Sequence, residues 1–186
     1  KILSLDLNTL EYRDKIKPAL PTVKLAKKSS KLAKRMNTLF DAEDKAGEFT
    51  RRSSLGLFAY VSNRIPEIAD ELYQIDDAVR AGFGWDKGPF ENWDMIGIEK
   101  TMSHFEGLGL KVPDWVSEMA AAGHKTFYKV ENGQRKFYSP STKSYQAIPG
   151  AEALILLDTV REGNVVWNSS EASVIDLGDG VLNVEF

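Results

Sequence analysis

The sequence contains no cysteine among its 186 residues. This absence excludes a disulfide framework, a thiolate zinc site and a cysteine nucleophile, and it is consistent with a reducing compartment. No apolar run exceeds five residues, as in Leu57–Val61, whereas a helix needs about 20 to cross a bilayer. No charged and apolar leader precedes a small-residue cleavage site either. We therefore expect a cytoplasmic protein with no membrane partner.

Histidine is scarce too, because the chain has only His104 and His124. Neither has a partner at metal-ligand spacing, so we interpret both as surface or capping residues. The carboxylate pair Asp76-Asp77 is more typical of caps and solvated faces than of acid and base catalysis. Ser53-Ser54 and Ser169-Ser170 lack the glycines of a nucleophile elbow. The residues alone predict no complete active site and no metal site.

The overall composition is that of a globular protein, with 42% hydrophobic and 27% charged residues. Its length is enough for one generous domain or two small ones. The chain starts at Lys1 without a methionine and stops at Phe186 inside an apolar alternation. We therefore expect a fragment of a longer protein.

Charge is unevenly distributed, because Lys1–Arg52 holds 13 basic and 7 acidic residues and the remainder holds 11 basic and 20 acidic ones. Apolar residues recur at helical spacing from Leu25 to Phe40, which predicts one amphipathic helix capped by Thr22. Its opposite face carries the basic side chains Lys24, Lys27, Lys28, Lys31, Lys34 and Arg35. A solvated face is the ordinary interpretation, and a phosphate-binding surface is the alternative. The missing aromatics and the acidic whole chain argue against nucleic acid.

A second helix is predicted around Leu55–Val61, which is apolar nearly all round and is therefore expected to be buried. Pro66 lies further along the same pattern, so we expect the helix to kink or restart there and the Ser62 carbonyl to find another partner. Asp76 is interpreted as the cap of a short helix through Val79.

Further helices follow. Gly82 or Gly84 is expected to end the preceding helix, and Pro89 to lie in the first turn of the next. Gly82, Gly84 and Gly88 do not form a phosphate loop, because they follow a helix and no Lys-Ser/Thr pair succeeds them. Two more helices are predicted over Glu99–Leu108 and Pro113–Ala122.

From Lys125 the pattern alternates and predicts strands, with turns at Glu131–Gly133 and near Pro140. A short helix is expected within 151–160, and Asp179-Gly180 predicts a hairpin in Ser173–Phe186. Four residues near the start match four others in spacing, at an offset of 133 positions: Asp6, Asn8, Thr9 and Tyr12 correspond to Ser139, Ser141, Thr142 and Tyr145. The first segment is therefore interpreted as the end of a preceding copy of the same module.

The segment Phe58–Ile98 resembles the C-terminal helical domain of the 3-hydroxyacyl-CoA dehydrogenases. That family has an Asn-Arg pair in a long helix, an Ile-Asp pair, a glycine-rich bend, and Gly-Pro-Phe leading to Asp and Gly. The matching residues are Asn63-Arg64, Ile75-Asp76, Gly82-Phe83-Gly84, Gly88-Pro89-Phe90, Asp94 and Gly97. Thr126–Lys129 resembles the closing strand, with Lys125-Thr126 where a glycine is usual. Arg64–Asp70 is most similar to the second of two tandem copies in long bacterial and archaeal forms.

The resemblance implies a mainly α fold, a dehydrogenase C-terminal domain of the 6-phosphogluconate-dehydrogenase type with small β-hairpin appendages. It divides the chain into residues 1–21, the tail of a preceding module and a linker; 22–148, the helical domain; and 149–186, a linker and the first hairpin of a crotonase-type hydratase domain. The parent would oxidise 3-hydroxyacyl-CoA with NAD in fatty-acid oxidation, and this fragment would bind no cofactor and be inactive.

The resemblance places the catalytic histidine and glutamate in an N-terminal Rossmann domain outside this chain. One family position maps here, a substrate-binding asparagine that corresponds to Asn63; the alternative is that Asn63 satisfies backbone groups near Pro66. The expected role is domain packing and part of the acyl-CoA cleft, beside intramolecular Rossmann and crotonase domains. A homodimer is an arrangement that the family allows. The competing hypothesis is a stand-alone polyanion-binding module that uses Lys24–Arg35.

Overall fold

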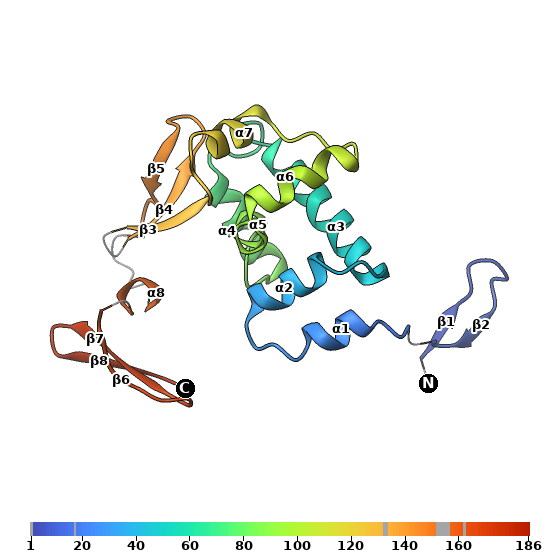
Figure 1. Ribbon diagram of the computed structural model, residues 1–186, viewed down its shortest axis with the longest axis horizontal. Helices are drawn as coiled ribbons and strands as arrows, with labels where there is room; N and C mark the ends of the chain where they lie inside the picture. The colour runs from blue at the N-terminus through green and yellow to red at the C-terminus, as the bar shows by residue number, and fades with distance from the viewer. Residues whose placement is uncertain (1, 17, 132–133, 152–156, 162) are drawn as a thin grey trace. The chain divides into compact units, whose positions relative to one another are not determined.

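A computed structural model describes residues 2–16, 18–131, 134–151, 157–161 and 163–186. Over these residues the chain is mainly helical, with eight helices and three small antiparallel sheets (Figure 1). The helices are α1 Pro21–Ala26, α2 Leu32–Phe40, α3 Lys45–Ser62, α4 Leu72–Phe83, α5 Pro89–Ile96, α6 Ile98–Gly107, α7 Asp114–Ala121 and α8 Leu157–Val160. The strands are β1 Leu3–Leu5, β2 Tyr12–Asp14, β3 Tyr128–Glu131, β4 Gln134–Ser139, β5 Ser144–Ala147, β6 Val165–Asn168, β7 Ser173–Gly178 and β8 Val181–Glu185.

The chain divides into two compact units, Lys1–Arg51 and Arg52–Phe186. In the first unit, the hairpin β1–β2 precedes the packed helix pair α1 and α2. In the second unit, α4–α7 and the sheet β3-β4-β5 precede the sheet β6-β7-β8. No helix within the described part of the chain is long and apolar enough to span a membrane.

The single basic helix that the sequence predicts is wrong. The structure breaks it into α1 and α2, and Lys31 has extended backbone before α2. Two causes act at the break: the Ser29 hydroxyl donates to the Lys31 carbonyl at 3.4 Å, and neighbouring lysines one turn apart repel each other. Thr22 is not a cap either, because α1 starts at Pro21 with Leu20 as the capping residue.

Helix α3 ends at Ser62, four residues before Pro66, so the predicted continuation into Pro66 is wrong. A proline disfavours helical backbone in the residue before it, and the chain turns through this region instead. The expectation for the Ser62 carbonyl is confirmed, since it accepts a hydrogen bond from Trp115 Nε1 at 3.3 Å. Burial of the helix is confirmed at Leu55, Phe58 and Val61, while Tyr60 is exposed.

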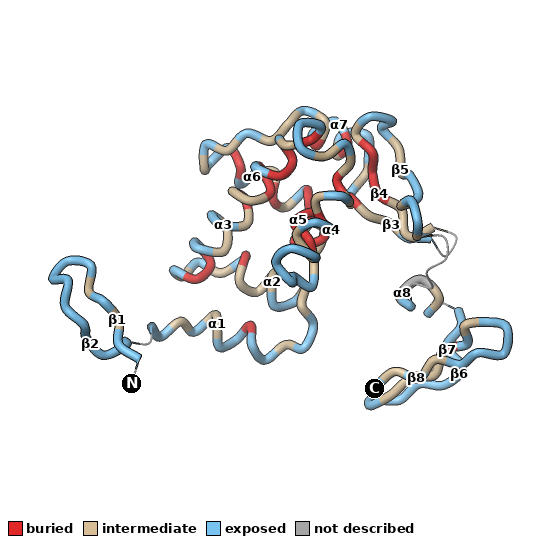
Figure 2. The backbone as a smooth tube through the Cα atoms, turned by 180° about the vertical axis from the view of Figure 1, so that it is seen from behind, coloured by how far each residue is buried: buried red, intermediate tan, exposed pale blue. Residues whose placement is uncertain are grey.

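The core of the second unit is aromatic, and Figure 2 shows buried positions gathered on α3–α7 and β4. Trp93 is fully buried and stacks on Phe58, with ring centroids 5.0 Å apart. Its other neighbours are Phe105 at 5.4 Å and Phe127 at 4.9 Å. Stacked and tilted aromatic pairs add to the free energy gained by burying their surface. Helices α6 and α7 agree with the predicted segments to within one residue at each end, and Pro89 lies in the first turn of α5 as predicted.

The predicted strands are confirmed in β3, β4 and β5, while Asn132 and Gly133 of the first turn lie outside the described residues. The hairpin at Asp179-Gly180 is confirmed, because both residues have positive φ between β7 and β8. Such a pair matches the right-handed twist of the flanking strands. Residues 152–156 of the short helix expected within 151–160 lie outside the described residues, and α8 is its last turn.

Candidate functional site

Asn63, the residue that the resemblance assigns to substrate binding, follows the last residue of α3. Its Nδ2 group donates two hydrogen bonds of 2.8 Å, to the Ala59 carbonyl one turn back and to the Lys111 carbonyl in the loop before α7. An asparagine side chain has two donors and one acceptor oxygen, so both donors serve the fold here. Oδ1 is the atom of Asn63 that remains for a ligand.

Asp76 has a position that the sequence did not predict. It lies inside α4 and is buried, whereas we expected it to cap that helix. Its carboxylate accepts the backbone N–H groups of Phe90 and Glu91 at 2.9 and 3.0 Å, and the Tyr128 hydroxyl at 2.9 Å. The free N–H groups in the first turn of α5 require acceptors. Asp76 therefore caps α5 from a neighbouring helix.

Gly88 explains why a distant residue supplies the cap. It is the N-cap of α5 and has no side chain that could accept these hydrogen bonds. A Cβ at this position would lie 2.3 Å from Asp76 Cγ, so the glycine leaves room for the aspartate. The predicted end of α4 is confirmed, because Gly84 has left-handed backbone after its last residue.

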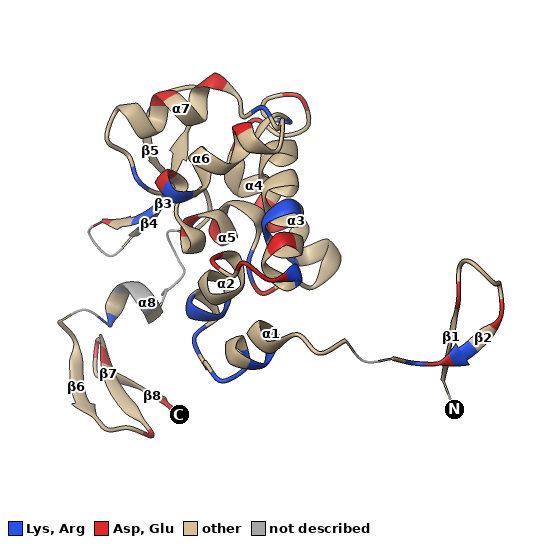
Figure 3. Cartoon of the chain, turned by 45° about the vertical axis from the view of Figure 1, so that its right-hand side comes forward, with Lys and Arg blue, Asp and Glu red and all other residues tan. Residues whose placement is uncertain are grey.

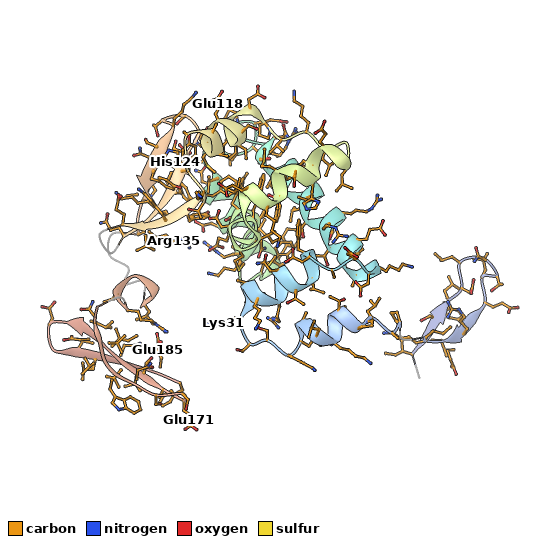
Figure 4. The ribbon with its side chains drawn as sticks, in the orientation of Figure 1. Lys31, Glu118, His124, Arg135, Glu171 and Glu185 are labelled. Atoms are coloured by element: carbon orange, nitrogen blue, oxygen red, sulfur yellow. The ribbon has the colours of Figure 1, made fainter. Side chains whose placement is uncertain are left out.

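Glu91 is the charge centre of the same cluster. Its side chain accepts the Gly88 N–H at 2.7 Å and ion-pairs with Arg80 at 2.7 Å and Arg135 at 2.6 Å. The guanidinium of Arg135, labelled in Figure 4, also lies 4.2 Å from the centroid of the Tyr128 ring. One carboxylate thus joins α4, α5 and β4 in a buried network, where loss of a partner is costly.

Asp94 holds the start of the small sheet against α5. Its two oxygens accept the backbone N–H groups of Phe127 and Tyr128 at 2.7 and 2.9 Å. The Phe127 ring is thereby held in the aromatic core. The sequence shows Asp94 and Tyr128 as polar residues, but it does not show that they are partners, because they lie more than 30 residues apart.

Burial dominates the electrostatics of this cluster. It raises the pKa of Asp76 to about 6 and the pKa of Asp94 to about 7, against the opposing effect of their backbone hydrogen bonds. Burial also raises the pKa of Tyr128, beside the Asp76 carboxylate. Burial opposes ionisation of Glu91, but the Gly88 N–H and Arg135 outweigh it and lower its pKa.

These carboxyls are suited to structure rather than to catalysis. Both carboxylate oxygens of Asp76 and both of Asp94 accept backbone N–H groups of the protein. These hydrogen bonds hold the two carboxyl groups in structural roles. The His124 ring, labelled in Figure 4, lies 5.2 Å from both the Tyr138 and Tyr145 rings. His104 is on α6. Within the described ranges no cluster of three or more potential metal ligands occurs.

Two open grooves in the described part of the chain could receive a ligand or a partner. A groove of about 600 Å³ in the second unit lies between residues 66–70 and α4, and its lining includes Ile68, Val79 and Phe83. A groove of about 490 Å³ in the first unit is lined mostly by apolar residues, including Leu20, Val23 and Phe49. Asn63 is not part of the lining of either groove.

The basic residues Lys24, Lys27, Lys28, Lys31, Lys34 and Arg35 are all exposed. Figure 3 colours the Lys and Arg positions of α1, of α2 and of the segment between them blue. Because α1 ends at Ala26 and α2 begins at Leu32, they do not form one continuous helical face. Gly82, Gly84 and Gly88 do not fit a dinucleotide-binding loop either, because Gly82 lies in helix α4, Gly84 ends that helix, and Asp76 occupies the space beside Gly88.

The chain is similar to a probable 3-hydroxyacyl-CoA dehydrogenase of Bacillus subtilis (strain 168), with 36% identity over 186 residues, 100% of this chain and 23% of that protein. It is also similar to a putative fatty acid oxidation complex trifunctional enzyme of Rickettsia felis, with 21% identity over 130 residues, 68% of this chain and 15% of that protein. No protein-family model and no solved structure matches. The chain is thus homologous to a segment of a probable dehydrogenase and spans less than a quarter of it.

Proposed function

We propose that this chain is a non-catalytic helical part of an NAD-dependent 3-hydroxyacyl-CoA dehydrogenase of fatty-acid oxidation, where it contributes domain packing and part of the acyl-CoA cleft. The observation that carries this proposal is that the whole chain aligns with 23% of the length of a probable 3-hydroxyacyl-CoA dehydrogenase. The buried carboxylates support a packing role, because Asp76, Glu91 and Asp94 are engaged by the fold.

In this proposal the enzyme acts in the cytoplasm, and NAD binds a Rossmann domain outside this chain. Residues 22–148 form a dehydrogenase C-terminal domain of the 6-phosphogluconate-dehydrogenase type. Residues 149–186 are a linker and the first hairpin of a crotonase-type hydratase domain. The exposed lysines of α1 and α2 border the path of the coenzyme A phosphates, because cations attract a polyphosphate ligand.

The activity is tested with two proteins, this chain alone and the full-length polypeptide that contains it. Oxidation of 3-hydroxybutyryl-CoA is followed as NADH absorbance. We expect activity from the full-length protein and none from the isolated chain. A rate for the isolated chain near that of the full-length protein would refute the packing role.

In this proposal Asn63 contacts the substrate through its side-chain oxygen Oδ1. In the full-length enzyme we expect Asn63→Ala to raise the KM for 3-hydroxyacyl-CoA, whereas a purely structural role would lower only thermal stability. Asn92→Ala is the matched control, because Asn92 Nδ2 likewise donates to a carbonyl, that of Lys87, at 3.2 Å. Equal KM values for the two variants would show that Asn63 does not contact the substrate.

A further inference from the structure

The groove of the first unit is lined by residues from three helices and from the segment before α1. Its polar lining residues are Lys45 and Thr50, and the Thr50 hydroxyl donates to the Ala46 carbonyl at 2.8 Å. The other lining residues are apolar: Pro18, Leu20, Val23, Leu39, Ala46 and Phe49. A recess of this size and composition is typical of small-molecule sites, which combine apolar walls with few polar groups.

Three exposed lysines extend or line this groove. Lys45, the first residue of α3, belongs to the lining. Lys24 and Lys27 extend the wall that α1 provides, because their backbone N–H groups donate to the Leu20 and Val23 carbonyls at 3.3 and 3.2 Å. Each of the two therefore lies one helical turn beyond a lining residue, on the same face. The groove thus joins an apolar wall to positive charge.

The groove of the second unit has the opposite charge. Its lining includes Glu67 and Asp70, and no basic residue is among the described residues that line it. In the first unit, the carboxylate of Asp44 beside Lys45 accepts the Gly47 N–H at 3.0 Å. Residues 18–50 hold seven basic and four acidic side chains, so cations are in excess in this segment. An anionic ligand is therefore attracted to the first groove and repelled by the second.

We propose that the groove of the first unit binds the unbranched hydrocarbon chain of a long-chain acyl ligand, with the anionic head of that ligand against Lys24, Lys27 and Lys45. An extended peptide would need partners for its backbone N–H and C=O groups, which an apolar wall does not supply, whereas a hydrocarbon chain needs none. Each methylene that enters the groove should strengthen binding about fourfold.

The head of the ligand is an anion, which is either the carboxylate of a fatty acid or the phosphates of coenzyme A. The lysines attract both kinds of head, so the experiment has one arm for each. This site deepens the proposed function and rests on it for the acyl nature of the chain.

Photoaffinity labelling of the full-length polypeptide that contains this chain locates the site. The probe is hexadecanoate with a diazirine near its methyl end, used as the free carboxylate in one arm and as the coenzyme A thioester in the other. Labelled peptides are identified by mass spectrometry. We expect label within residues 18–50 in at least one arm, and that arm identifies the head. Unlabelled hexadecanoyl ligand with the same head should suppress the label, whereas its butanoyl counterpart should not.

Two phenylalanines provide a matched pair of variants. Phe49 and Phe83 are 72% and 75% exposed, and each lines one of the two grooves. Phe49→Glu should lower the label within residues 18–50 by about tenfold or more, because it puts a charge into the apolar wall. Phe83→Glu should leave that label unchanged. Lys45→Glu is a second test that keeps the apolar wall intact, and it should lower the label about twofold to fivefold.

The absence of label within residues 18–50 in both arms would overturn the inference. Equal losses of label in Phe49→Glu and Phe83→Glu would overturn it too, as would a butanoyl ligand that competes as strongly as the hexadecanoyl one. The proposed function can fail separately, because oxidation of 3-hydroxybutyryl-CoA depends on NAD and uses a short chain, whereas the labelling needs no NAD and reports on a long chain.

Discussion

Asp76 shows how one buried side chain joins elements that are distant in the sequence. It belongs to α4, it caps α5, and it accepts the hydroxyl of Tyr128 on β3. Because all three donors lose their acceptor together when the carboxylate is removed, its contribution to stability exceeds that of a surface aspartate. Its neighbour Asp77 is exposed and pairs with Arg80.

This contrast predicts the effect of two conservative substitutions. Asp76→Asn should lower the free energy of unfolding by about 2–3 kcal/mol, because an amide offers one acceptor oxygen to three donors. Asp77→Asn should change it by less than about 0.5 kcal/mol, as surface ion pairs contribute little. Urea unfolding of the two variants and the parent chain measures both values. Equal losses would show that Asp76 is not the cap of α5.

Asp94 predicts the pH dependence of stability. Its pKa in the fold is about 7, above the ordinary value of an aspartate, so the folded chain binds more protons than the unfolded chain between pH 4 and 7. The contribution of Asp94 is therefore complete below pH 4 and is lost as pH rises through 7. Asp76, at about 6, acts in the same direction. Glu91 has a lowered pKa, so its contribution is lost only at more acidic pH.

We therefore expect the stability advantage of the parent chain over Asp94→Asn to shrink by about 1–3 kcal/mol between pH 5 and pH 8. Urea unfolding at four pH values in that range measures this difference. Asp86→Asn, at an exposed position, is the control variant measured beside it. An Asp94→Asn profile parallel to that of the parent would mean that Asp94 ionises normally in the fold.

At the scale of elements, local patterns predicted the helices whose ends have local causes. Pro89 in the first turn of α5 and Gly84 after α4 are such cases. Patterns failed where a cause lay elsewhere in space: the α5 cap comes from Asp76, and the clamp on β3 comes from Asp94. The break between α1 and α2 is different, because it lies at Ser29 and Ser30 inside the stretch whose apolar spacing predicts one helix.

Two glycines of the α4–α5 region predict opposite effects of the same substitution. Gly88→Ala should lower the free energy of unfolding by about 2 kcal/mol or more, because its methyl group would overlap Asp76. Gly82→Ala should raise it by up to about 1 kcal/mol, since Gly82 lies in α4 with open space beside it. Thermal unfolding of both variants is the measurement, and destabilisation of equal size would contradict the close approach of Gly88.

The helix pair α1–α2 separates the proposed function from the polyanion-binding alternative. We expect no binding of single- or double-stranded nucleic acid by this chain in a filter-binding assay at 50 mM salt, because the basic residues are divided among two short helices and the segment that joins them. Binding that weakens steeply with salt, and that is lost in Lys27→Glu/Lys31→Glu, would favour the alternative instead.

At the scale of the molecule, the mainly helical class followed from the sequence because amphipathic spacing dominates residues 22–122. The candidate site did not follow, because its polar contacts join α4 and α5 to strands more than 30 residues away. The strands β3–β5 are therefore part of the helical module rather than an appendage to it. Residues 149–186, by contrast, supply none of the contacts described in the cluster of Asp76, Glu91 and Asp94.

This difference predicts the outcome of two truncations. A chain that ends at Ile148 should unfold cooperatively and retain near-ultraviolet circular dichroism. A chain that ends at Lys125 should lose both, because it lacks Phe127, Tyr128 and Arg135. Urea unfolding and circular dichroism distinguish the two proteins. Loss of cooperative unfolding in the chain that ends at Ile148 would show that the domain extends beyond residue 148.

The close approach of Gly88 to Asp76 also constrains how related sequences can diverge. Any side chain at 88 displaces the aspartate, and any loss of the aspartate leaves the first turn of α5 without its acceptor. Neither position can change alone without loss of stability, so we expect related sequences to keep both residues or to lose both. A distant relative that has lost one should have lost both, with a serine, threonine or asparagine as a local cap in place of the glycine.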